Sequence, residues 1–239
     1  MTNLYIPICG FFCALLLIIL FFTKSHVDNK ETRIFKLMLI ASFIDSILMI
    51  SIIFIAYKWK EQEVILKLLN KLDYTQFIIW IWSLFMYIAY ITHNEKHSQE
   101  IYKKIYKITF FLNFILICFV YVLPVKLYNQ GNIMYSYGQS SNLMYFVCGI
   151  YVVLSLIFLI FNFKKIISKK CIPFFVFVTM AIFVMILRTI KPEIVIITAV
   201  IAYVDLIMYF TIENPDMKMI QQLELAKNQA EKANRAKSD

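Results

Sequence analysis

The sequence predicts an all-α membrane protein with seven transmembrane helices, the N-terminus outside, followed by a cytoplasmic helical linker of the coiled-coil type. Two observations lead to this fold class. Hydrophobic residues make up 61% of the 239 residues and charged residues only 16%, whereas soluble domains carry about 25% charged residues. The apolar residues also form long runs, each near the roughly 20 residues that a helix needs to cross a bilayer. These runs leave no room for a soluble catalytic domain.

Seven apolar runs mark the predicted membrane spans. An unpaired backbone group is costly in lipid, so each run is expected to be a helix. The first run has no basic residue before it, unlike a signal peptide, and the first positive charge is Lys24. The sixth run is short and carries Pro173 near its start. The spans are expected at about 4–23, 35–57, 74–92, 108–125, 143–163, 172–189 and 193–212.

The basic residues predict the orientation of these spans. The loops after spans one, three and five hold twelve Lys and Arg residues, against seven in the loops after spans two, four and six. Cytoplasmic loops carry the excess of positive charge, which places the N-terminus outside and the C-terminal tail in the cytoplasm. Topology therefore explains the net charge of +9, and we expect the lipid bilayer, not nucleic acid, as the partner.

Two segments expected outside the membrane have patterns of their own. Apolar residues recur at helical spacing between Val64 and Leu72, with Lys67 and Lys71 on other faces. This predicts a short amphipathic helix lying in the outer interface. The segment 128–142 is polar and rich in turn residues. It is either a lid over a ligand site or a plain connecting loop, and the loop is the favoured interpretation.

The composition changes abruptly after the last span. Asn214-Pro215-Asp216 predicts a helix start, with Asn as the N-cap, Pro at the first helical position and an acid in the first turn. Small or apolar residues then recur at steps of four and three, which makes a short, alanine-rich heptad seam that pairs weakly by itself. Such a seam suits a signalling linker, and a solvated helix with incidental alanines fits it as well. The seam consists of Met219, Leu223, Ala226, Ala230 and Ala233.

Two stretches near the end of the chain are distinctive: YFTIENPD at 209–216 and AEKANRAKSD at 230–239. They resemble the junction between the membrane sensor and the kinase core in bacterial two-component sensor histidine kinases. In that family a Phe-Leu start and a Ser-His-Glu-(Ile/Leu)-Arg-Thr-Pro phosphoacceptor box come next. None of the three histidines here has that context, and no Gly-rich nucleotide-binding motif is present. We therefore expect no catalytic residues in this chain.

The resemblance implies a division of the chain into a sensor region, residues 1–212, and a signalling helix, residues 213–239, that leads to a kinase core. The chain is then either an isolated sensor region or a gene product without its catalytic half. The resemblance also implies ATP and Mg as cofactors of the kinase core, with no cofactor in this chain. A response regulator would be the partner of that core, and two copies would pair through the tail. The expected location is the bacterial plasma membrane, with the C-terminus in the cytoplasm.

Other functions fit parts of the same sequence. The module could serve another output enzyme, such as a diguanylate cyclase, because such linkers are shared between output types. A stand-alone seven-helix receptor or a transporter is a further alternative. A transporter predicts internal repeats and helices broken near the midplane. No convincing repeat is visible, and Pro124, Pro173 and Pro192 lie near span ends.

Polar residues at bilayer depth are costly and mark candidate functional sites. Asp45, Asn113 and Asp205 fall at a similar depth in the inner half of the predicted spans, so one buried polar network is expected. No Lys or Arg lies at that depth, so at least one aspartate is protonated or a cation is bound. The three are candidates for relaying a signal to the last span. The alternative role, favoured for Asn113, is a structural hydrogen-bond cluster.

Residues at the span edges are weaker candidates. Arg188, at the outer end of the sixth span, either snorkels to headgroups or contacts an anionic ligand. His93 and His97 have an i, i+4 spacing, yet a solvated helix end explains them better than a metal site. Cys9 and Cys13 share a helix face without further ligands nearby, which favours ordinary packing, and no metal site is expected.

Overall fold

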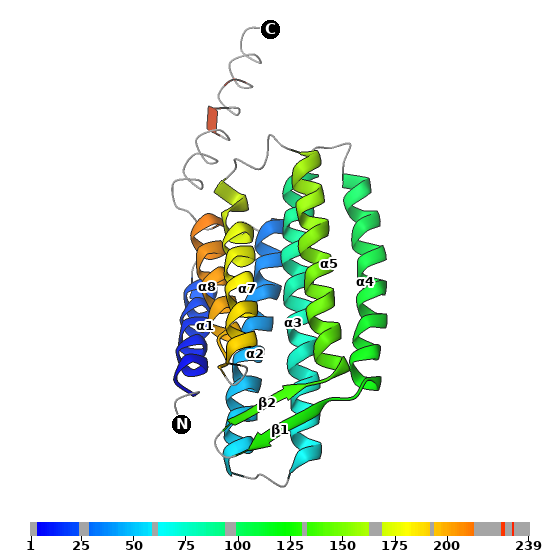
Figure 1. Ribbon diagram of the computed structural model, residues 1–239. Coiled ribbons are helices and arrows are strands. Elements are labelled where there is room, and N and C mark those ends of the chain that lie inside the picture. Colours follow the sequence, from blue (N-terminus) through cyan, green and yellow to red (C-terminus); the bar gives the residue numbers. More distant parts are fainter. Residues whose placement is uncertain are drawn as a thin grey trace.

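The computed structural model describes residues 4–23, 29–58, 62–93, 99–130, 133–162, 169–191 and 194–212, together with residues 226, 227 and 231 of the tail. The described chain is a bundle of helices with one β-hairpin at one end (Figure 1). The last helix of the bundle, α8, ends at the opposite end, from which the tail continues. These two ends are called the hairpin end and the tail end below.

The all-α class is confirmed for the described residues. The helices are α1 (Tyr5–Thr23), α2 (Lys30–Lys58), α3 (Glu63–Thr92), α4 (Gln99–Val122), α5 (Gln139–Phe161), η3 (Lys169–Cys171), α7 (Ile172–Ile190) and α8 (Ile197–Ile212). The hairpin consists of β1 (Lys126–Gln130) and β2 (Ile133–Tyr137). Every predicted span overlaps one of the α-helices.

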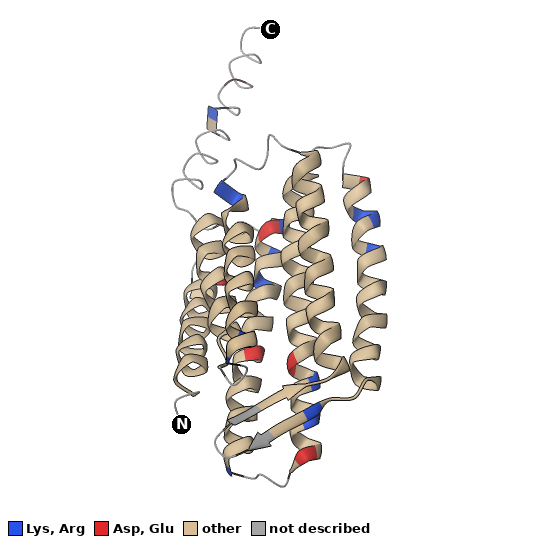
Figure 2. Cartoon of the chain, in the orientation of Figure 1, with Lys and Arg blue, Asp and Glu red and all other residues tan. Residues whose placement is uncertain are grey.

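Six of the described helices are long and apolar enough to cross a membrane. These helices support the prediction that the chain is a membrane protein. The remaining apolar helix, α8, has 16 residues, fewer than the roughly 20 of a typical span. The count of seven crossings and the outside position of the N-terminus stay predictions. Figure 2 shows Lys and Arg gathered toward the ends of the helices, with the middle of the bundle mostly uncharged.

The helix α3 forms the centre of the bundle. It packs against α2, α4 and α5, while α8 packs against α1, α2 and α7 (Figure 1). In its most apolar stretch 78% of the residues are buried, against 11% in α4. The central helix is also the least hydrophobic of the six. A helix enclosed by protein can carry polar groups that find partners, whereas a helix at the edge must present apolar side chains to lipid.

The prediction of a separate amphipathic helix between Val64 and Leu72 is wrong. The helix α3 begins at Glu63 and continues without a break to Thr92. Leu66 is 1% exposed and faces the bundle, while Val64 is 80% exposed. No Pro or Gly separates the amphipathic run from the apolar run that follows, so the helical pattern continues in phase through both.

The polar segment 128–142 contains a hairpin and the start of a helix, not a plain loop. The strands β1 and β2 pair antiparallel, from Lys126 opposite Tyr137 to Gln130 opposite Ile133. Gly138 follows with φ +124°, in the region that favours glycine, and a Cβ there would lie 2.9 Å from the Pro124 carbonyl oxygen. The chain then enters α5 at Gln139. The hairpin thus lies across the hairpin end of the bundle (Figure 1).

The tail seam is mostly untested. Met219, Leu223, Ala230 and Ala233 lie outside the described residues. Ala226 is helical and exposed. The coiled-coil linker over residues 213–239, and the division of the chain at residue 212, stay predictions.

Candidate functional site

Three aspartates are buried inside the bundle. Asp45 lies on α2 and is 3% exposed, Asp73 lies on α3 and is 7% exposed, and Asp205 lies on α8 and is 0% exposed. The sequence pointed to Asp45 and Asp205, and the structure places both in one group, together with Thr198 at the start of α8. We call Asp45, Asp73, Thr198 and Asp205 the carboxyl cluster.

Asp205 connects α8 to the central helix. The indole Nε1 of Trp80 on α3 donates a hydrogen bond of 3.0 Å to Asp205 Oδ1, and Ser42 of α2 lies next to the same carboxyl. The Trp80 ring, 1% exposed, packs against Phe177 of α7 with ring centroids 5.2 Å apart. One carboxyl group therefore joins three helices, and its partner ring contacts a fourth.

Asp45 and Asp73 lie side by side on the antiparallel helices α2 and α3. The Thr198 hydroxyl lies next to Asp45. Asp45 Oδ2, Asp73 Oδ1 and Thr198 Oγ1 are buried atoms without a hydrogen-bond partner, and so is Asp205 Oδ2. In the part of the chain that the structure describes, no ion pair reaches any of the three aspartates.

Asp73 is the member of this cluster that sequence reasoning missed. The predicted span begins at residue 74, so Asp73 falls in the predicted outer loop. The signal that identifies it is a stripe at steps of four and three along α3, all of whose members are buried. The stripe consists of Leu66, Asn70, Asp73, Phe77 and Trp80. Such spacing places residues on one helix face, and here it carries a carboxyl group into the bundle.

Asn113 does not belong to this cluster, so the expectation of one network for all three sequence candidates is wrong. It lies on α4, 6% exposed, next to Tyr151 of α5. The helix α4 packs against α3 and α5, whereas Asp205 lies on α8 among α1, α2 and α7. The rotation of each helix, which residue counts do not give, decides which side chains meet. The proposed relay role of the three residues stays a prediction.

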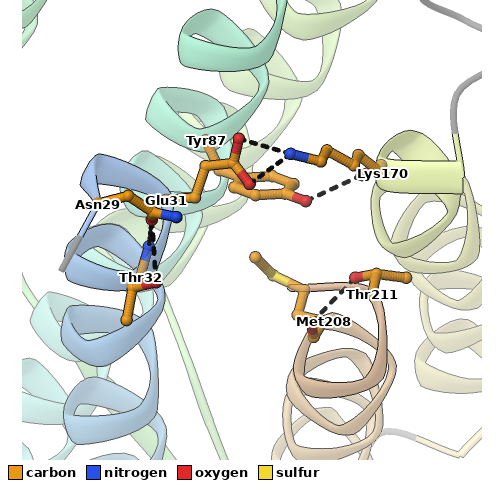
Figure 3. Close-up of polar contacts among 7 residues, drawn as sticks. All are labelled: Asn29, Glu31, Thr32, Tyr87, Lys170, Met208 and Thr211. Carbon is orange, nitrogen blue, oxygen red and sulfur yellow. Dashed lines mark hydrogen bonds and ion pairs between the residues drawn. The ribbon is translucent and has the colours of Figure 1, made fainter. Parts of the chain in front are cut away.

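At the tail end an ion pair joins α2 to the segment before α7 (Figure 3). Lys170 Nζ lies 2.7 and 2.8 Å from the two carboxylate oxygens of Glu31, which is 7% exposed. The Tyr87 hydroxyl of α3 donates to the Lys170 carbonyl oxygen at 3.2 Å. Thr211, in the last turn of α8, lies next to Tyr87. We call Glu31, Lys170 and Tyr87 the tail-end clasp.

Arg188 forms hydrogen bonds with residues at the hairpin end of the bundle. Its guanidinium donates to the Ser136 carbonyl oxygen at 3.2 Å and to the Ser141 hydroxyl at 3.4 Å, and lies 4.6 Å from the centre of the Tyr145 ring. The Tyr74 hydroxyl donates to Ser136 Oγ at 2.7 Å. Arg188 and Tyr74 therefore hold β2 against α5 and α3. A contact of Arg188 with an anionic ligand stays a prediction.

The other edge candidates have ordinary surroundings. Cys9 is exposed, Cys13 is partly buried and both are free thiols. His93 follows the last turn of α3, where its Nδ1 lies 3.1 Å from the Ala89 carbonyl oxygen, and His97 lies outside the described residues. Within the described ranges no group of three or more His, Cys, Asp or Glu residues converges on a metal position.

Comparisons with known proteins add no relative. Neither a scan of family models, nor a search of curated proteins, nor a search of solved structures gives a match.

Proposed function

We propose that this chain is the membrane-embedded input module of a two-component histidine kinase, in which α8 passes a stimulus from the bundle to the tail. The observation that carries the proposal is the hydrogen bond between Trp80 and Asp205. It connects the central helix to the helix from which the tail continues. The resemblance of the residues after α8 to sensor–kinase junctions supplies the kind of output.

The contacts along α8 suit a helix that moves between two positions. Thr198 lies next to Asp45 at its start, Asp205 bonds to Trp80 in its middle, and Thr211 lies next to Tyr87 at its end. Polar contacts between membrane helices contribute only about 0.6 kcal/mol each. A small shift of α3 relative to α8 thus exchanges contacts at low energetic cost, as population shift in a signalling element requires.

The remaining parts of the proposal follow from the resemblance. The tail would pair two copies of the chain, and the kinase core would use ATP and Mg to phosphorylate a response regulator. The protein would reside in the bacterial plasma membrane with the tail in the cytoplasm. Another output enzyme, such as a diguanylate cyclase, would use the same movement of α8.

A transporter is the second candidate, because buried carboxyl groups in membrane helices often mark ion pathways. The carboxyl cluster favours it. Transporters of the inverted-repeat kind bind their substrates at helices broken near the midplane. By contrast, α2 and α3, which carry Asp45 and Asp73, are continuous helices of 29 and 30 residues. We therefore prefer the sensor.

The test is a fusion of the full chain to a histidine kinase core, with autophosphorylation measured in membrane vesicles. Trp80→Phe removes the donor of the bond between α3 and α8, and Asp205→Leu removes its acceptor. Both are expected to shift basal phosphorylation in the same direction by about threefold, the factor that corresponds to about 0.6 kcal/mol.

Trp82→Phe is the matched control. Trp82 Nε1 also donates a 3.0 Å bond from α3, but to Thr109 of α4, a helix that does not lead to the tail. This variant should leave basal phosphorylation unchanged. Equal phosphorylation in all four proteins would contradict the proposed route through Trp80 and Asp205.

A further inference from the structure

We propose that Asp45, Asp73 and Thr198 form a binding site for a small monovalent cation, with Na⁺ as the probe. The proposal concerns what the carboxyl cluster binds. It does not depend on whether α8 transmits a signal, so it goes beyond the proposed function.

The Asp45–Asp73 pair carries a charge that needs a partner inside the bundle. Two adjacent carboxyl groups in a dry site do not both ionise without compensation, so one proton is shared between Asp45 and Asp73. The pair then keeps one negative charge inside the bundle. A buried charge needs a partner, and no ion pair from the described residues reaches the cluster. The Arg188 side chain, which lies near Tyr74, is bound to Ser136 and Ser141.

The cluster also offers a set of free oxygen atoms. Asp45 Oδ2, Asp73 Oδ1 and Thr198 Oγ1 all lack a hydrogen-bond partner. Thr198 is 1% exposed and lies next to Asp45. It is a neutral hydroxyl, and it comes from a third helix. Oxygen atoms of carboxylates and hydroxyls are ligands for hard cations. Three oxygen atoms without hydrogen-bond partners, one from each of three helices, are therefore available to coordinate one cation.

The kind of ion follows from the ligands and the charge. Calcium takes six to eight oxygen ligands, and zinc prefers nitrogen and sulfur. The described residues bring together two carboxyl groups and one hydroxyl, with no group of three acids, histidines or cysteines around a metal position. The single remaining negative charge is balanced by a single positive one. A monovalent ion therefore fits the charge of the site.

The titratable groups around the site come from four helices. Cys13 of α1 lies near Asp205, and the Cys13 thiol reaches toward the Ala202 carbonyl oxygen at 3.9 Å. Tyr74 of α3 lies near Asp73. The carboxyl groups of Asp45 on α2 and Asp205 on α8 are close enough to interact electrostatically. None of these side chains is basic, so a proton is the natural competitor for the same position.

The experiment is a binding measurement on the full chain in nanodiscs of uncharged lipid. Radioactive sodium is titrated at alkaline pH with choline chloride as the inert salt. Saturable binding of about one ion per chain is expected, and the affinity should fall at acidic pH because a proton displaces the ion. An absence of saturable binding at alkaline pH would show that the carboxyl pair holds protons only, and would overturn the proposal.

Two variants locate the site. Thr198→Val keeps the shape of the side chain and removes one ligand, so the affinity for sodium should fall at least about tenfold. Asp45→Asn should abolish binding. Thr179→Val is the matched control, because the exposed Thr179 hydroxyl bonds only to the Phe175 carbonyl oxygen of its own helix. If Thr198→Val binds sodium as the wild type does, or if Thr179→Val loses binding equally, the assignment to this cluster is wrong. Valine and threonine have nearly the same volume, so Thr198→Val is expected to fold. The test therefore does not depend on whether Asp45→Asn folds.

Discussion

Buried acids at the tail end and in the middle of the bundle have opposite surroundings. Glu31 is 7% exposed and lies against the ammonium group of Lys170. Asp45, 3% exposed, lies against a second carboxyl group and a hydroxyl. The protein thus neutralises one buried acid with its own cation and leaves the other to a proton or a bound ion. The first arrangement holds the helices in one place, and the second can change with conditions outside the chain.

The two arrangements predict opposite responses to loss of charge. Removal of one member of a buried ion pair leaves an uncompensated charge, which destabilises proteins by about 3–5 kcal/mol when the pair is fully buried. Removal of the charge from an acid without a basic partner removes a cost instead. Three variants test this difference, from the largest expected effect to the smallest.

The largest effect is expected for Lys170→Met, which removes the cation from the tail-end clasp and keeps most of the side-chain length. The Lys170 side chain is 28% exposed, so we expect a loss of about 2 kcal/mol, below the range for fully buried pairs. The midpoint of thermal unfolding in detergent measures it. The pair Glu63–Lys67 is the control: it has the same 2.7 Å separation, but its side chains are 63% and 39% exposed. Lys67→Met should cost at most about 0.5 kcal/mol, and equal losses in both variants would remove the distinction.

A smaller effect of opposite sign is expected for Asp45→Asn measured in choline chloride without sodium. The amide is neutral and of the same size, so the midpoint of unfolding should stay the same or rise, by up to about 1 kcal/mol of stability. Glu31→Gln, the same change in the paired acid, should lower the midpoint. A loss of stability in Asp45→Asn as large as in Glu31→Gln would show that Asp45 is held by an unrecognised positive partner.

The smallest effect is expected for Tyr87→Phe. It removes the hydroxyl that donates to the Lys170 carbonyl oxygen at 3.2 Å and leaves the ring in place. A loss of about 0.5 kcal/mol follows from one neutral hydrogen bond of long separation. Combining Tyr87→Phe with Lys170→Met in a double-mutant cycle shows whether the clasp acts as a unit. If the two losses simply add, Tyr87 supports the backbone of η3 without influencing the ion pair.

Much of the architecture follows from local sequence. Runs of about 20 apolar residues must be helical in lipid because their backbone groups find partners only within the segment, and every predicted span overlaps a helix. The starts of these helices were harder to place. The first turns of α2, α3 and α4 contain charged residues such as Lys30, Glu63 and Glu100, which hydropathy assigns to loops although a helix extends readily beyond the apolar core of a membrane.

The candidate site was predictable in part. Asp45 and Asp205 could be recognised because a carboxyl group within an apolar run is costly and needs a reason. Asp73 could not be recognised from hydropathy, since it lies just before the predicted span that begins at residue 74. Its burial depends on the neighbours of that helix, and only the stripe from Leu66 to Trp80 hints at it.

What the sequence by itself determined is the class of the protein: a chain of apolar helices with acids at positions where lipid does not tolerate them. Tertiary structure alone decided which acids meet and which find a cation. Glu31 and Lys170 are 139 residues apart, and Trp80 and Asp205 are 125 residues apart. No local pattern encodes such pairs. They arise because the packing of each helix fixes its rotation, and that rotation turns Asp45 toward Asp73 and Asn113 toward Tyr151.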